Sequence, residues 1–144
     1  MISNTNEPKV IQHDSFTDDL VVKSLGTKWE LYRAFNFYYL DGDKKTDVSV
    51  PVGFITDFAS TPVWLYSFFP PIGLYNKAAT LHDYLYNIEC PVAITRREAD
   101  LFFLQAMEVL KVPKLQRILM YLAVRLGGAS RFRKPSKLTN PVSI

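Results

Sequence analysis

Cysteine, histidine and long apolar runs are scarce in this sequence of 144 residues. The single cysteine, Cys90, excludes an internal disulfide and is compatible with a reducing compartment. With only two histidines beside it, the chain has too few ligands for a structural zinc site. The longest apolar and aromatic stretch, 63–75, is too short to span a bilayer and contains two prolines. We therefore expect no transmembrane segment, and the polar N-terminus does not resemble a secretory signal.

Acidic residues are absent from the last sixteen positions, which hold four basic residues. Because the formal net charge of the chain is +3, the remainder carries about −1 and is not a basic platform for nucleic acid. The length suffices for one hydrophobic core. We expect a flexible N-terminal segment (1–19), a single domain (20–128) and a basic C-terminal tail (129–144).

The first third of the chain has the composition of β-strands. Residues 20–25 and the aromatic-rich stretch 28–40 show partial alternation, and Asp41-Gly42 after them is a strong hairpin signal. In the stretch that follows, Val48, Val50 and Val52 alternate with polar residues or proline and are expected to point inward. Residues 20–55 are therefore predicted to form a small antiparallel sheet.

The remaining two thirds have helical periodicity, and capping signals divide them into three helices. The first is predicted over 76–87, and the second begins at Thr95, where Glu98 three residues later completes a capping box. The third has Pro113 in its first turn, ends at Gly127-Gly128 and carries an apolar stripe at positions 118, 119, 122 and 126. The predicted fold class is α+β, with a small N-terminal antiparallel sheet packed against three C-terminal helices.

Helix geometry brings His82 and Asp100 together. His82 lies five residues before the expected end of the first helix, and Asp100 lies five residues after the start of the second, so both are about 7.5 Å from the turn if the helices are antiparallel. Asp100 shares a face with Phe103, Leu104 and Met107, where a buried carboxylate needs a partner. An Asp100 that accepts from one imidazole nitrogen leaves the other free to take a proton, as a general base requires.

Three further residues complete the candidate site. Tyr86 follows His82 by one helical turn and is placed to hydrogen-bond the carboxylate of Asp100. Asp83 points about 100° away from His82 and is available to a hard cation, and the loop 53–62 supplies a second carboxylate, Asp57. Calcium is the candidate cation, because it accepts several oxygen ligands in irregular geometry.

Other interpretations of the same residues stay open. His82 and Asp100 can be a buried polar pair that links two helices, and Asp57 or Ser60 can cap the segment that follows them. Ser60 lacks the surroundings of a nucleophile elbow, and Cys90 has no activating charge besides the histidine. Serine and thiol nucleophiles are therefore the weaker hypotheses.

Four blocks of the sequence, "VPVGFITDFASTP", "AATLHDYLYN", "RREADLFFLQAM" and "ILMYLAVRLGG", resemble in order a family of small phage and prophage proteins classed only as domain of unknown function 1353. The resemblance covers the chain from about residue 20 to 128. It implies a viral or prophage origin and a place among virion, tail or lysis functions.

The pair "LHDYLY" and "EADLFF" is similar to the paired-helix core of secreted phospholipase A₂. That resemblance implies His82 as the base, Asp83 as a calcium ligand, and Tyr86 and Asp100 as the partners that orient the imidazole. Two features of that family differ here. The cysteines that flank its His-Asp dipeptide are replaced by Ala79 and Leu85, and "GFITDFAS" stands in place of its glycine-rich calcium loop.

Together these observations predict a phage-encoded hydrolase, made in the host bacterial cytoplasm. His82 would activate water, and a cation held by Asp83 would polarise an ester or amide carbonyl of a cell-envelope substrate. The alternative is a non-catalytic virion component of the tail or baseplate. In that case the His-Asp pair is structural, and the aromatic stretch 64–75 and the basic tail bind other virion proteins.

Overall fold

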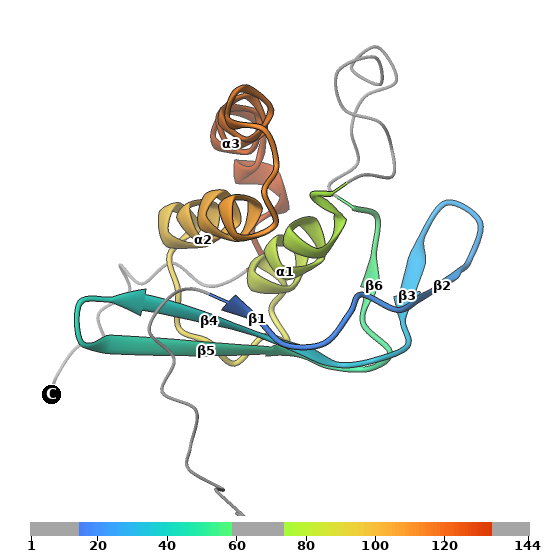
Figure 1. The fold of residues 1–144 in the computed structure, drawn as a ribbon. Helices are drawn as coiled ribbons and strands as arrows, with labels where there is room; N and C mark the ends of the chain where they lie inside the picture. The colour runs from blue at the N-terminus through green and yellow to red at the C-terminus, as the bar shows by residue number, and fades with distance from the viewer. Residues whose placement is uncertain (1–14, 59–73, 134–144) are drawn as a thin grey trace, which may run out of the picture.

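The computed structural model describes residues 15–58 and 74–133, and it has the predicted α+β class (Figure 1). Strands occupy the N-terminal half and three helices the C-terminal half. The predicted antiparallel pairing is confirmed, but the strands form two three-stranded sheets instead of one. The aromatic stretch 64–75 lies outside the described residues except for its last two positions.

The first sheet contains β1 (Ser15–Phe16), β4 (Phe35–Asp41) and β5 (Lys44–Val50) in the order β1-β4-β5. The β4–β5 hairpin closes through Gly42, whose φ of 61° is the left-handed conformation that the Asp-Gly signal predicts. β1 belongs to the segment 1–19 that was predicted to be flexible, and it pairs with the middle of β4. The sheet therefore begins earlier than the sequence indicates.

The second sheet contains β2 (Val22–Ser24), β3 (Trp29–Leu31) and β6 (Ile55–Thr56) in the order β2-β3-β6. The predicted strand 28–40 is broken at residues 32–34, where the chain leaves this sheet and enters the first one. The short strand β6 lies beside β3 and ends next to α1, and this places the following residue, Asp57, near the helices.

The helices are α1 (Asn76–Tyr86), α2 (Arg96–Val109) and α3 (Lys114–Gly127), followed by the short 3₁₀ helix η2 (Ala129–Arg131). These bounds agree with the prediction. The capping box at the start of α2 is confirmed, because the Thr95 hydroxyl accepts from the Glu98 amide while the Glu98 carboxylate accepts from the Thr95 amide. η2 lies in what was predicted to be the basic tail.

The core lies between the β4–β5 hairpin and the helices α1 and α2 that cover it (Figure 1). Val48 and Val50 point inward as predicted, whereas Val52 is 62% exposed, because β5 ends at Val50 and the alternation does not continue past the strand. The largest fully buried side chains come from both layers: Leu31, Phe35, Phe37, Tyr75, Leu81, Leu85, Phe103 and Met107.

Helix α3 packs against α2 at the outside of the helical layer (Figure 1). Its predicted apolar stripe is present in the sequence but faces outward, and Met120 is the residue of α3 that is buried. None of the helices in the described part of the chain is long and apolar enough to cross a membrane.

Candidate functional site

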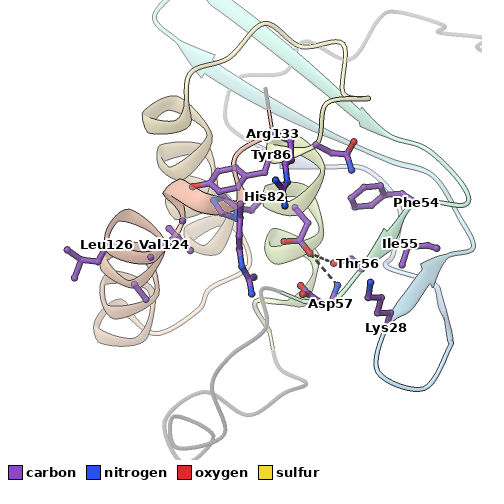
Figure 2. Close-up of a pocket in the computed structure, with 16 residues that line it drawn as sticks. Lys28, Phe54, Ile55, Thr56, Asp57, His82, Tyr86, Val124, Leu126 and Arg133 are labelled. Atoms are coloured by element: carbon purple, nitrogen blue, oxygen red, sulfur yellow. Dashed lines mark hydrogen bonds between the residues drawn. The ribbon is translucent and has the colours of Figure 1, made fainter. Parts of the chain in front are cut away.

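A cavity of about 830 Å³ opens between the second sheet, α1 and the end of α3 (Figure 2). The β6 region contributes Phe54, Ile55, Thr56 and Asp57, and α1 contributes His82, Asp83 and Tyr86. The opposite wall is formed by the last turn of α3 and by η2 and the residues after it. The members of that wall are Ala123, Val124, Leu126, Gly127, Gly128, Arg131 and Arg133.

Two carboxylates lie on the β6 side of this cavity. The Oδ2 atom of Asp83 accepts hydrogen bonds from the Thr56 hydroxyl at 2.5 Å and from the Asp57 amide at 3.4 Å. Figure 2 marks both bonds with dashed lines at Thr56 and Asp57. Burial and, after it, the nearby negative charge of Asp57 together raise the pKa of Asp83 to about 7. The structure thus brings together the two carboxylates that the sequence proposed as metal ligands.

The carboxylate pair suits a hard cation in its chemistry, since both side chains offer oxygen ligands and a cation would relieve their mutual repulsion. Within residues 15–58 and 74–133, however, no cluster of three or more His, Cys, Asp or Glu side chains is suited to a metal ion. A cation here would take its remaining ligands from water, the Thr56 hydroxyl or backbone oxygens.

The predicted contact between His82 and Asp100 is confirmed. His82 Nε2 lies 2.7 Å from Asp100 Oδ1, and both side chains are buried. The imidazole packs between the rings of Tyr86 and Phe103, with centroid distances of 4.2 and 4.7 Å. These contacts hold the ring in one orientation, so that one edge faces Asp100 and His82 lines the cavity.

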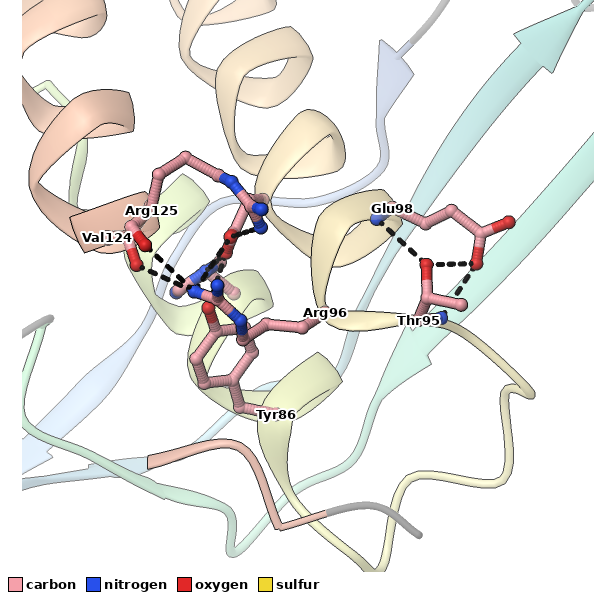
Figure 3. Close-up of polar contacts among 8 residues, drawn as sticks. Tyr86, Thr95, Arg96, Glu98, Val124 and Arg125 are labelled. Carbon is pink, nitrogen blue, oxygen red and sulfur yellow. Dashed lines mark hydrogen bonds and ion pairs between the residues drawn. The ribbon is translucent and has the colours of Figure 1, made fainter. Parts of the chain in front are cut away.

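Side chains from all three helices contact Asp100, and Figure 3 labels Tyr86, Arg96 and Arg125 among them. Its Oδ1 also accepts from the Tyr86 hydroxyl at 2.5 Å, and its Oδ2 accepts from Arg125 Nη1 at 2.7 Å, with Arg96 Nη1 at 3.7 Å. Arg96 Nη1 donates in addition to the carbonyls of Val124 and Arg125. The buried carboxylate therefore ties the last turn of α3 to the His82 pair.

These contacts set the protonation of the pair. Burial alone would raise the pKa of Asp100, but hydrogen bonds from His82, Tyr86 and Arg125 outweigh burial and hold that pKa below its usual value. Burial lowers the pKa of His82, and its hydrogen bond to Asp100 offsets this only in part. The pair is thus an ionised Asp100 and a neutral His82 whose Nε2–H donates to it.

The second imidazole nitrogen, Nδ1, carries the lone pair. No described residue forms a hydrogen bond with it, and no buried side-chain nitrogen or oxygen among these residues lacks a partner. His82 is a lining residue of the cavity, although only 3% of it is exposed. A buried carboxylate on one nitrogen and an accessible lone pair on the other are what a general base needs.

Gly128 packs closely against the side chain of Tyr86. A Cβ atom at Gly128 would lie 2.7 Å from the Tyr86 hydroxyl and would also collide with the Val124 carbonyl, whereas one at Gly127 meets nothing. The glycine at the end of α3 thus leaves room for the hydroxyl that binds Asp100.

Sequence patterns did not single out Thr56 or the arginines. Arg96 could have been found from its i,i+4 spacing to Asp100, but nothing local indicates that Arg125 reaches the same carboxylate from α3. Of the other candidates, Ser60 lies outside the described residues. Cys90 is buried and is not among the residues that line the cavity.

The fold and site define an α+β protein with a buried His–Asp pair that opens into a cavity. A family model described as "Protein of unknown function (DUF1353)" matches residues 29–124, which run from β3 into α3. The chain therefore belongs to this family, as the four sequence blocks predict. Neither a curated protein nor a solved structure matches the chain.

Proposed function

We propose that this protein is a hydrolase in which His82 is the general base. The observation that carries the proposal is the placement of the imidazole: its Nε2 is held by the buried Asp100, its ring lines the cavity, and burial lowers its pKa. The same carboxylate binds Tyr86 and Arg125, so it is fixed before a substrate arrives.

The reaction follows from this geometry. Nδ1 of His82 takes a proton from water while the water oxygen forms a bond to the carbonyl carbon of an ester or amide, whose π electrons move to the oxygen. When the carbonyl re-forms, the bond to the alcohol or amine breaks, and the imidazolium returns the proton to the leaving group. Asp100 stabilises the imidazolium between these steps.

Asp83 and Asp57 are the proposed cation ligands, with calcium as the candidate. A bound cation would polarise the carbonyl and stabilise negative charge on its oxygen. The raised pKa of Asp83 supports this assignment, because it shows that burial and Asp57 disfavour the ionised carboxylate. A cation bound between the two carboxylates would stabilise the ionised form of both.

The biological setting is part of the proposal. The resemblance to phage and prophage proteins supports synthesis in a host bacterial cytoplasm and action on an ester or amide of the cell envelope during infection. The resemblance of the segments "LHDYLY" and "EADLFF" to secreted phospholipase A₂ supports testing phospholipids first.

Hydrolysis tests the proposal directly. We would assay p-nitrophenyl butyrate and short-chain phosphatidylglycerol, each with calcium and with a chelator, on the wild type and on His82→Gln. His13→Gln, which replaces the other histidine, is the matched control. We expect His82→Gln to lose at least a hundredfold in turnover, since general-base catalysis contributes roughly that much or more, and the control to retain it. A His82→Gln variant that folds and hydrolyses as fast as the wild type would refute the assignment.

The second candidate is a virion component of the tail or baseplate. The outward apolar face of α3 favours it, since such faces mark contacts with other proteins. This candidate predicts that the protein copurifies with phage particles, has no turnover above the buffer rate, and keeps its place in the particle after His82→Gln.

A further inference from the structure

The outer face of α3 consists of Leu115, Ile118, Leu119, Leu122 and Leu126. Their exposed fractions are 71%, 38%, 42%, 47% and 88% in that order. The spacing of three and four residues places them on one side of the helix. α3 thus turns a continuous row of large aliphatic side chains toward solvent.

Polar contacts on the inner side fix this orientation. Arg125 is bound to Asp100, the α3 carbonyls of Val124 and Arg125 accept from Arg96, and Arg117 donates to the Val112 carbonyl. Rotating α3 to bury the leucines would break its contacts with Arg96 and Asp100 and leave the buried carboxylate of Asp100 short of a positive partner. The exposure of the outer face is therefore a consequence of how the site is assembled.

The outer face has a nearly palindromic sequence. Two antiparallel copies of α3 can be related by a twofold axis that passes between Met120 and Tyr121. In that arrangement each apolar position of the outer face of one copy lies opposite an apolar position of the other. The pairs are Leu115 with Leu126, Leu119 with Leu122, and Ile118 with the exposed Ala123.

The charges of α3 are compatible with the same arrangement. The helix has no acidic residue, so two copies would repel each other if their cations met. Two of its three cations are held on the inner side, Arg117 by the Val112 carbonyl and Arg125 by Asp100. In the antiparallel arrangement the third, Lys114, falls opposite Gly127.

We propose that the outer face of α3 binds a second copy of this chain, in a twofold dimer with the two α3 helices antiparallel. The aliphatic side chains exposed in one copy are buried against those of the other. This inference does not depend on the hydrolase proposal. It does affect the cavity, because Leu126 belongs both to the outer face and to the cavity wall. In the dimer the rim of each cavity lies beside the start of α3 from the other copy.

The molecular mass in solution is the first test. Sedimentation velocity on the wild type should give twice the 16.5 kDa chain mass, with a monomer appearing on dilution. Leu119→Glu and Leu122→Glu, which lie nearest the twofold axis, should raise the dissociation constant at least a hundredfold. Both positions are more than a third exposed, and circular dichroism would verify that the variants fold. Ile88→Glu is the matched control, since Ile88 is 68% exposed but lies in the α1–α2 connection, and it should remain a dimer.

Crosslinking tests the direction of the helices. A short bismaleimide should join Leu115→Cys to Leu126→Cys when the two variants are mixed. It should not join either variant to itself, because like positions are separated along the helix by about 16 Å at 1.5 Å per residue. The wild type controls for Cys90, which is buried. A wild type that is monomeric at its highest soluble concentration, including one that binds anionic vesicles through α3 instead, overturns the proposal. So does a dimer that survives Leu119→Glu, or crosslinking of a single variant to itself.

Discussion

Replacing Asp83 by asparagine should stabilise the folded protein, and by an amount that depends on pH. Asparagine keeps an oxygen that can accept from the Thr56 hydroxyl and the Asp57 amide but removes the charge that burial and Asp57 disfavour. Because the pKa of Asp83 is raised in the folded protein, the folded state holds a proton that the unfolded chain releases. The wild type therefore loses stability as the pH rises from about 4 through about 7.

The size of the effect follows from the same pKa. A change from 3.8 to about 7 corresponds to about 4 kcal/mol at full ionisation, and solvent screening at the cavity surface reduces this to roughly 2–4 kcal/mol. The stability difference between Asp83→Asn and the wild type should grow by that amount between about pH 4 and pH 8.

Urea denaturation at both pH values measures this difference. Asp47→Asn on the exposed side of β5 is the control and should show no such growth. Calcium added at the higher pH should raise the stability of the wild type and leave Asp83→Asn unchanged, since the variant lacks the ligand charge. If the difference in unfolding free energy between Asp83→Asn and the wild type does not vary with pH, the charge of Asp83 is not disfavoured by burial and Asp57. The case for a bound cation would then fail.

Three further predictions concern the network around Asp100. Arg125→Met should cost about 3 kcal/mol of stability, because it leaves the buried carboxylate of Asp100 without one partner; urea denaturation would check this, and an unchanged midpoint would contradict it. Tyr86→Phe should cost about 1–3 kcal/mol through the lost hydrogen bond, and a neutral effect on the midpoint of denaturation would argue against it. Gly128→Ala should destabilise the fold and displace the Tyr86 hydroxyl, whereas Gly127→Ala should not; equal melting temperatures for the two would refute the packing argument.

The parts of the structure that sequence predicts are those fixed by local chemistry. The capping box at Thr95, the left-handed Gly42 and the helix bounds depend on residues a few positions apart. The contact between His82 and Asp100 is long-range, yet it was predictable. A short connection joins the two helices, so residues at equal distances from the turn lie beside each other.

The parts that sequence does not predict depend on which elements meet. Nothing in residues 28–40 indicates that the chain changes sheets at residues 32–34. The apolar stripe of α3 does not indicate which side of the helix faces the core, and in the structure Arg125 binds Asp100 on the inner side while the stripe is exposed. Thr56 reaches Asp83 for a similar reason, because the pairing of β3 with β6 is non-local.

The protonation of His82 at neutral pH tests the account most directly. The protein has two histidines, so ¹⁵N chemical shifts of the imidazole nitrogens can be assigned with His13→Gln. We predict a neutral ring near pH 7 with the proton on Nε2 and a lone pair on Nδ1, and loss of this tautomer preference in Asp100→Asn. A proton on Nδ1, or a charged imidazolium at that pH, would mean that no base faces the cavity and would contradict the proposed hydrolase.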